Sequence, residues 1–498
     1  MAKRDIRSFN LVDEPWIPVV DTGRVSLKGL FSTPELRAIG GNPVQKIAVM
    51  KLLLAIAQAA CPLSDDREWE QAGPEGVASS CISYLERWKG RFDLYDRDRP
   101  FLQLPSVKKA AVQSYGAVIP YIATGNTTVL TELQIEKELD DAERALLLVT
   151  LMGFALGGKK ADNKVVLTEG YSGKSRTARP GPSVAYKGLL HSFVTGRTVH
   201  ETIWFNLVTA DALDESRMFN GGIGVPPWER MPSGEGCEVA EELKTTLTGR
   251  LVPLCRFCLL VESGLHYTEG IQHMNYQDGI CDPSVAADSS KKKVKVLWAD
   301  PEKRPWRQLP ALLSFIGHDT SAFDCFQLRV ALPRASRLSR DFAVWSGGLK
   351  VSSNAGEQYV SGSDDFVDSE VWLSGDMINE VWFSQLQNEM QRLEQMAKRL
   401  YGAIRAYYTL LTAEGEGMAG RGVSLFWQLC ENDFQELVDA CGTASFEGKQ
   451  DELSALWVRF VRYAYGVYDR SCPSDTARQL EAWASSRPNL RKFVSREE

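Results

Sequence analysis

The chain lacks any run of about 20 apolar residues, the length that an α-helix needs to cross a bilayer. Its longest apolar stretch, residues 146–156, is shorter and contains polar breaks. The N-terminus carries Lys3 and Arg4 but no apolar segment of the signal-peptide type. We therefore expect no transmembrane helix and a cytoplasmic location.

Histidine is also scarce, and acidic residues outnumber basic ones by 64 to 57. The 498 residues include only five histidines, and the formal net charge is -7. This net charge argues against binding of nucleic acid through bulk electrostatics, so any contact with phosphates must come from local basic patches. The ten cysteines are scattered without a dense framework, which indicates reduced thiols.

Three stretches supply local basic patches. Their members are Lys159, Lys160, Lys164, Lys174, Arg176 and Arg179; Lys291, Lys292, Lys293 and Lys295; and Arg329, Arg334, Arg337, Arg340 and Lys350. The lysine run follows Asp288 and two serines, which favours a solvated hairpin tip. For the arginine stretch two interpretations stay open, a solvated face or a row that neutralises phosphates.

The length predicts two or three domains. Residues 1–370 mix β-like runs, at 165–167, 251–261 and 294–298, with helices at about 44–60, 77–89 and 141–156. This irregular order indicates an α+β domain and differs from the regular alternation of a doubly wound sheet. We expect a second domain over residues 371–498.

The second domain shows clear helical periodicity. From Phe383 to Leu411 the apolar positions alternate in steps of three and four, which predicts a helix of over seven turns. Similar stripes follow over residues 423–441 and 453–467, and a shorter amphipathic piece runs from Asp475 to the break at Pro488. A loop is expected at 414–422. Four such helices predict a four-helix bundle, because each stripe can be buried only against the others.

One segment, residues 168–175 (TEGYSGKS), nearly matches a phosphate-binding P-loop. Thr168 stands where the first glycine is required, and Pro180 and Pro182 prevent a long helix from following. Nucleotide hydrolysis is therefore disfavoured. The segment is either a Gly/Lys/Arg loop that touches a nucleic-acid backbone or a plain surface loop, since glycine allows close backbone approach in both cases.

Two further patterns resemble metal sites. Cys255 and Cys258 form a C-x-x-C, with Cys281, His266 and His273 downstream, but the pair sits in an apolar run that predicts buried thiols. His318–Asp319 has no second histidine pair at helical spacing, so we expect a structural role for it. We predict no catalytic centre, no metal and no cofactor.

Residues 345–360 have short alternating strands around a Ser-Asn-Ala-Gly tip, which predicts a β-hairpin. Near the start, residues 9–19 (FNLVDEPWIPV) read as a short apolar strand that Pro15 and Pro18 confine to an edge or a bend. This string and residues 99–103 (RPFLQ), followed by the later segments in the same order, resemble the large subunit (the CasA family) of the type I-E CRISPR surveillance complex, Cascade. The resemblance covers nearly the whole chain.

The resemblance implies three segments that contact nucleic acid. A loop near the protospacer-adjacent motif (PAM) would contact the 5′ handle of the guide RNA, a glycine loop would lie at the minor groove, and a wedge hairpin would part the first base pair. The residues implied are Asn126, Val129, Leu130 and Thr131; Gly170, Gly173, Lys174 and Arg176; and Lys350, Ser352, Ser353 and Asn354. The family's wedge glutamine is absent, and its minor-groove lysine falls near residues 272–275, which contain no lysine.

The function implied by the resemblance is non-catalytic. The subunit would recognise the PAM in double-stranded DNA, begin strand separation and help to recruit a helicase-nuclease for antiviral defence, with other Cascade subunits and the guide RNA as partners. Minor-groove edges mainly distinguish A·T from G·C, so several related PAMs would be accepted. Two alternatives stay open, a degenerate P-loop or HD-type phosphohydrolase and a purely structural protein-binding scaffold.

Overall fold

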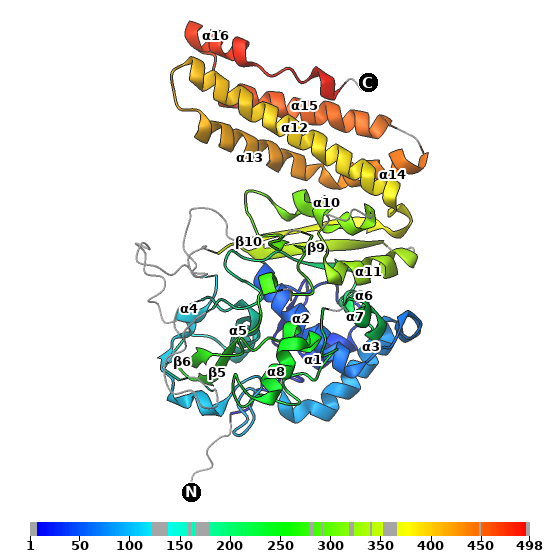
Figure 1. The fold of residues 1–498 in the computed structure, drawn as a ribbon, viewed down its shortest axis with the longest axis vertical. Helices are drawn as coiled ribbons and strands as arrows, with labels where there is room; N and C mark the ends of the chain where they lie inside the picture. Colours follow the sequence, from blue (N-terminus) through cyan, green and yellow to red (C-terminus); the bar gives the residue numbers. More distant parts are fainter. Residues whose placement is uncertain are drawn as a thin grey trace. The chain divides into compact units, whose positions relative to one another are not determined.

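The computed structural model describes residues 7–121, 138–157, 161–162, 164–165, 167, 179–216, 218–278, 282–290, 292–317, 323–338, 341–351, 366–447 and 450–494. Contacts divide the chain into two compact units. Unit 1 contains Met1–Pro305 and Thr320–Glu370, and unit 2 contains Trp306–Asp319 and Val371–Glu498. The helices and strands are labelled in Figure 1.

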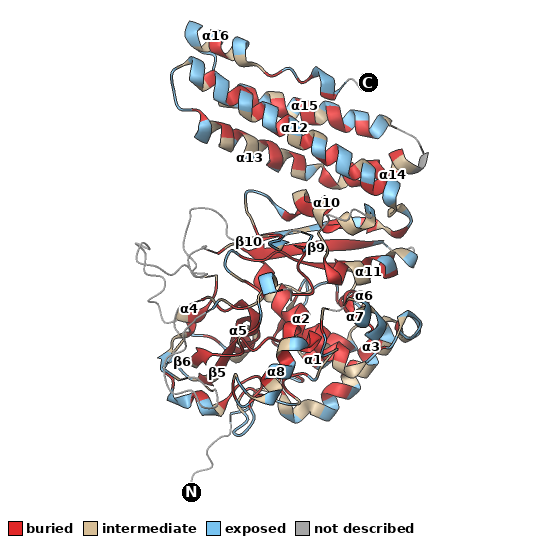
Figure 2. Cartoon of the chain, viewed as in Figure 1, coloured by how far each residue is buried: buried red, intermediate tan, exposed pale blue. Residues whose placement is uncertain are grey.

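Unit 1 is built around helix α2, Pro43–Ala60. Asn42 and Gln45 cap its start reciprocally, and Pro43 occupies the first turn, where its missing N–H is not needed. Fourteen of its residues are buried, and the helix is red along most of its length in Figure 2. By length and composition α2 could cross a membrane, but 78% of its most apolar window is buried within the unit, as in a core helix.

Helices α3, Asp66–Trp88, and α5, Asp141–Phe154, pack against α2. The sequence places the first of these at 77–89, whereas α3 begins eleven residues earlier. Gly73, with φ at +61°, and Pro74 produce a kink inside α3. Because these residues interrupt the apolar periodicity, the sequence pattern did not indicate the part of the helix before them. Asp140 caps α5 and bonds the N–H of Glu143, close to the expected start.

Small antiparallel sheets cover this helical core. Strands β4 (His191–Thr195), β9 (Asp341–Leu349) and β10 (Phe366–Ser374) form one sheet in the order β10-β9-β4. In its register His191 pairs with Gly347 and Thr195 with Ala343. A second sheet has the order β3-β6-β5, with bounds Val112–Gln113, Gly264–Glu269 and Arg256–Val261. The α+β expectation is therefore confirmed.

The two strings that carry the family resemblance meet in space. β1, Ile17–Val19, pairs with β2, Gly23–Val25. On its other side Val19 bridges to Ile39, and the carbonyl of Pro18 accepts from the N–H of Gly40. The N–H of Leu94 bonds the carbonyl of Phe9, and the N–H of Phe101 bonds that of Asp93. The side chain of Gln103, 2% exposed, then accepts from the N–H of Leu260 in β5 and donates to Leu94.

Three expected strands are corrected by the structure. The run at 251–261 is a strand only from Arg256, because Thr246 caps helix α9, Leu247–Leu251, which ends where the strand was expected to begin. Val165 and Leu167 lie outside any strand, and the N–H of Val165 turns back to the carbonyl of Asp162. The run at 294–298 shortens to β8, Lys295–Val296, which pairs with β7, Ala287–Asp288.

Unit 2 is a helical bundle, as the periodicity predicts. Its long helix α12, Glu380–Leu410, begins at the cap Asn379 and buries the expected stripe from Phe383 to Tyr407. It contacts α13 (Glu416–Asn432), α14 (Phe434–Glu447), α15 (Asp451–Ser471) and α16 (Ala477–Ser486). Figure 2 shows the resulting stripes of buried and exposed residues along α12.

Two details of the bundle differ from the expectation. The stripe at 423–441 belongs to two helices, because the chain leaves the helix at Asp433, whose carboxylate accepts bonds from Arg459 and Tyr463 of α15. The loop expected at 414–422 is mostly helix α13. Its Gly422 is buried, and a Cβ there would lie 2.5 Å from the Cδ1 of Ile404, so the glycine serves close helix packing.

Two of the three glycines of α13, Gly420 and Gly422, should respond oppositely to alanine. We expect Gly422→Ala to lower the free energy of unfolding of unit 2 by about 1–2 kcal/mol, because the added methyl overfills the contact with α12. Gly420 has no atom within 4 Å of an added Cβ, so Gly420→Ala should raise it by about 0.5–1 kcal/mol. Urea midpoints measured by labelling of buried Cys430 test both, and equal shifts would contradict the packing role.

The segment 306–319 joins unit 2 although the sequence places it in the first domain. The Trp306 ring lies 4.6 Å from the ring of Phe434, and Arg307 stands 3.8 Å above the ring of Trp427. Arg307 also bonds Glu394 of α12 at 2.8 Å. These aromatic and ionic contacts are made with residues more than eighty positions away, so periodicity could not show them.

Candidate nucleic-acid interface

Most of the residues implied by the resemblance lie outside the described residues. These are Asn126, Val129, Leu130 and Thr131; Gly170, Gly173, Lys174 and Arg176; and Ser352, Ser353 and Asn354. Lys350 is described, at the end of β9. The site can nevertheless be built from the residues that flank the three segments, all of which belong to unit 1.

The first and third segments share a flank. Tyr121 precedes residues 122–137, Phe366 follows residues 352–365, and their rings are 5.6 Å apart. The Tyr121 hydroxyl also lies 3.5 Å from the Nε2 of Gln45 in α2. The segment expected to contact guide RNA therefore begins at the place on the core where the segment expected to act as a wedge ends.

The other flank of the wedge segment meets residues 185–189. The N–H of Val351 bonds the carbonyl of Lys187, and Lys350 lies 3.8 Å from Asp300. Gly188, with φ at +91°, passes so close that an added Cβ would lie 1.7 Å from the carbonyl oxygen of Leu349. Only glycine fits this conformation and this approach.

The second segment also returns to this place. After Arg179 the chain runs beside the end of α5, where the N–H of Gly181 bonds the carbonyl of Ala155 at 2.7 Å. It continues directly into residues 185–189, the stretch that holds the wedge flank. The flanks of all three predicted segments are thus held within one connected part of unit 1.

A small pocket lies beside the flank of the second segment. It is lined by Arg179, Gly181, Ala185, Tyr186 and Leu189 of that flank, by Arg250 and Arg256, and by residues 272–276. Residues 272–275 are those at the expected position of the minor-groove lysine. The structure therefore brings this position beside the flank of the glycine loop, and Gln272 and Asn275 supply hydrogen-bonding groups there without a charge.

A buried ionic network lies beneath the pocket and was missed by the sequence analysis. Lys51 of α2 and Asp282, each with a side chain 2% exposed, form an ion pair, and the Lys51 Nζ also lies 2.7 Å from the hydroxyl of Ser183. Fully buried His191 bonds the Ser183 carbonyl and the Ser284 hydroxyl. A lysine inside the otherwise apolar run of α2 was the available signal.

Electrostatics keep this network in one charge state. Burial alone would raise the pKa of Asp282, but the Lys51 ammonium and His191 outweigh burial and hold it below its usual range. Burial lowers the pKa of His191 to about 4, although Asp282 opposes the shift. His191 is therefore neutral at pH 7. Lys51 donates to the Ser183 hydroxyl, and Asp282 accepts from the hydroxyl and the N–H of Ser284.

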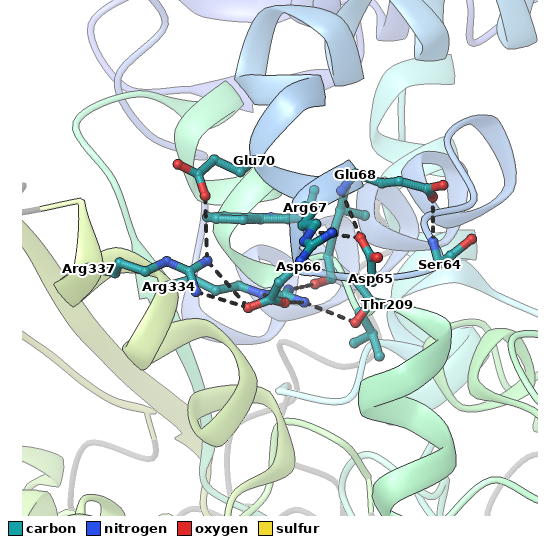
Figure 3. A network of polar contacts seen from close by, with 12 residues as sticks. Ser64, Asp65, Asp66, Arg67, Glu68, Glu70, Thr209, Arg334 and Arg337 are labelled. Carbon is teal, nitrogen blue, oxygen red and sulfur yellow. Dashed lines mark hydrogen bonds and ion pairs between the residues drawn. The ribbon is translucent and has the colours of Figure 1, made fainter.

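The arginine stretch does not form a free row for phosphates. Arg334 of α11, Phe326–Arg337, is 2% exposed and donates to Asp66 at 2.7 Å and to Thr209 at 3.1 Å (Figure 3). Arg337 contacts the same carboxylate at 3.3 Å, and Arg329 bonds Asp324. Arg340 lies outside the described residues. The phosphate-row interpretation is therefore wrong for Arg334, which ties α11 to α3.

The enzyme-like patterns give the following result. Cys255 and Cys258 are buried free thiols, as expected, and burial raises the pKa of both. His266 and His273 bond backbone carbonyls of Ala110 and Pro253. The P-loop-like residues 168–175, Cys281, and His318–Asp319 lie outside the described residues. Of the lysine run, Lys291 lies outside the described residues, Lys292 and Lys293 lie between β7 and β8, and Lys295 begins β8. The three described lysines are exposed, as a solvated tip requires.

The fold places the chain in a class of two-part proteins, in which an irregular α+β unit is continued by a helical bundle. The chain belongs to the Cse1 family: the model for CRISPR-associated protein Cse1 matches residues 10–466. A curated relative, CRISPR-associated protein CasA/Cse1 of Thermus thermophilus, is 29% identical over 342 residues, which are 64% of this chain and 62% of the relative. The resemblance to the CasA family is thus confirmed.

Solved structures agree with this assignment. The crystal structure of Thermobifida fusca Cse1 has a TM-score of 0.76 at 19% identity, over 98% of both chains. Thermus thermophilus CasA gives 0.72 at 19% identity, over 98% of this chain and 99% of that one. A chain of a structure described as a CRISPR RNA-guided surveillance complex gives 0.70 at 18% identity, over 98% and 100%. At these identities the likeness establishes the fold.

Proposed function

We propose that this chain is a non-catalytic subunit of an RNA-guided CRISPR surveillance complex. It recognises the PAM in double-stranded DNA and starts the separation of the strands. Its partners are other Cascade subunits and the 5′ handle of the guide RNA, and it helps to recruit a helicase-nuclease to the bound target. Family membership supports the assignment to such a complex.

One observation carries the DNA-binding part of the proposal. The flanks of the three predicted contact segments converge, through the Tyr121–Phe366 contact and through residues 179–189. This common anchorage supports the proposal that a single end of a duplex meets all three segments.

The energetics explain why no chemistry is needed. Opening one base step costs a few kcal/mol, which a wedge and phosphate contacts can offset locally. Guide RNA then pairs with the exposed strand, and this exchange of one duplex for another is nearly balanced. The protein needs to supply only the first opened step.

The test is binding by the reconstituted complex to duplexes that differ only in the PAM, with and without this chain. Shortening residues 352–356 should weaken binding to a PAM-containing duplex by about 10- to 100-fold, because roughly 1.4–3 kcal/mol of opening free energy is no longer offset.

A target with a pre-opened bubble next to the PAM should recover most of the lost affinity, and binding to a single-stranded target should stay unchanged. Equal binding by the full and the shortened hairpin would reduce the chain to a scaffold. Metal- or nucleotide-dependent turnover lost in Lys174→Ala or His318→Ala would instead show an enzyme.

A further inference from the structure

A buried arginine holds both ends of the segment that contains the glycine loop. Arg256 is the first residue of β5 and is 1% exposed. Its Nη2 donates to the carbonyl of Leu156 at 2.7 Å and to that of Arg179 at 2.9 Å. Its Nη1 donates to the carbonyl of Cys255 at 2.7 Å, and its guanidinium lies 5.8 Å from the centre of the Tyr267 ring.

Leu156 and Arg179 are 23 positions apart in the sequence, so Arg256 joins the two ends of a long segment. We call these two ends, residues 153–156 and 179–183, the neck of the segment. Backbone bonds reinforce the closure, from Gly181 to the carbonyl of Ala155 and from Ser183 to that of Gly153. A Cβ on Gly181 would lie 2.1 Å from the carbonyl oxygen of Gly153, so the two chain segments of the neck are in direct backbone contact. The neck is therefore fixed by described residues alone.

The neck presents one cation to solvent. The carbonyl of Arg179 accepts a hydrogen bond from Arg256. The side chain of Arg179 is exposed and lines the same pocket as residues 272–276. A guanidinium on a fixed backbone loses only side-chain freedom when it binds a phosphate, whereas one on a free backbone must lose backbone freedom as well. The contribution of Arg179 to binding should therefore depend on Arg256.

We propose that Arg256 is a positioning residue for DNA binding, which fixes the neck of the glycine-loop segment and thereby directs Arg179 to the DNA backbone without touching DNA itself. The inference rests on the proposed function and adds a residue that neither the family resemblance nor the motifs indicate. An arginine suits this role because the Nη2 of its planar guanidinium donates to two carbonyls while Nη1 donates to a third. A lysine ammonium does not reproduce this geometry.

The experiment compares Arg256→Met, Arg179→Ala and the double variant in the assembled complex, with a PAM-containing duplex titrated at several salt concentrations. Each phosphate contact contributes about one to the slope of log K against log salt. Arg179→Ala should lower the slope by about one and weaken binding roughly three- to tenfold at physiological salt. Arg256→Met should lower the slope by the same amount, and the double variant should bind no more weakly than Arg256→Met.

Arg256→Lys keeps a buried cation and should fall between wild type and Arg256→Met; it replaces that variant if the methionine protein does not fold. Arg67→Ala, an exposed arginine at the start of α3, is the matched control and should leave the slope unchanged. Additive losses in the double variant, or a normal slope in both Arg256 variants, would overturn the proposal. If wild-type binding does not depend on this chain at all, the proposed function itself fails.

Discussion

Replacing Lys51 with methionine is expected to lower the free energy of unfolding of unit 1 by about 3–5 kcal/mol. The methionine fills a similar volume, but at pH 7 the Asp282 carboxylate, 2% exposed, then keeps only the neutral His191 beside it, 3.7 Å away. Removing one partner of a buried ion pair costs far more than the pair contributes, because a desolvated charge stays behind. Pulsed thiol labelling of buried Cys258 along a urea gradient reports the unfolding of unit 1 alone.

Lys46→Met is the matched control on the same helix. Lys46 is 30% exposed and lies 3.7 Å from Asp368, so the control should cost less than about 1 kcal/mol. Lys51→Met combined with Asp282→Asn should recover part of the loss, because no buried charge is left unpaired. Equal effects at both lysines would show that the buried network adds nothing.

The pH dependence of the Lys51→Met effect has a definite sign. In the wild type the pKa of Asp282 lies below its unfolded value. Its contribution to stability is therefore fully present above about pH 4 and is lost as the pH falls toward the pKa of the folded state. Without Lys51, burial favours the neutral Asp282 carboxyl, and the pKa of His191, 3.7 Å away, is no longer lowered by the ammonium, so uptake of one proton by this pair relieves the penalty as the pH falls. The difference in stability between the two proteins should therefore shrink from pH 7 toward pH 5.

Replacing Glu389 with leucine is expected to lower the free energy of unfolding of unit 2 by about 2–4 kcal/mol. This α12 carboxylate is 2% exposed and accepts from the Trp457 Nε1 at 2.5 Å, from Arg392 at 2.7 Å and from Gln385 at 2.6 Å. Leucine offers no acceptor, so the buried indole N–H loses its partner. Labelling of Cys430 and Cys441 measures this transition separately from that of unit 1.

Glu389→Gln keeps an acceptor oxygen and should cost only about 1 kcal/mol, since the shape and part of the bonding remain. Glu416→Ala removes a carboxylate that is 64% exposed, 3.4 Å from Arg405, and should change stability by less than about 1 kcal/mol. A leucine variant as stable as the glutamine variant would mean that Glu389 is dispensable for the bundle.

Helix positions could be predicted from the sequence wherever one face carries a long apolar stripe. The stripe of α12 repeats over more than seven turns, and only one way of burying it is available. Glycine misled the same argument at α13. In that helix Gly422 allows close packing against Ile404, and composition alone does not distinguish such a glycine from one in a loop.

The candidate site could be predicted only in outline. Its segments follow from the order of motifs, but their common anchorage depends on contacts such as Tyr121 with Phe366 and Val351 with Lys187, between residues far apart in the chain. The same holds for the arginine stretch. Arg334 has the spacing of a phosphate-binding residue, yet its carboxylate partner Asp66 lies 268 positions away.

The sequence by itself determined the family, the α+β class and the helical C-terminal part, because these depend on local periodicity and on the order of short motifs. Tertiary structure alone decided which charges are buried and which are free. The sequence assigned no role to Lys51 or Arg256 and left Arg334 open between a solvated face and a phosphate contact, but each finds carbonyls or a carboxylate supplied by distant segments. Desolvation penalises a charge unless such partners are assembled, and only the folded chain assembles them.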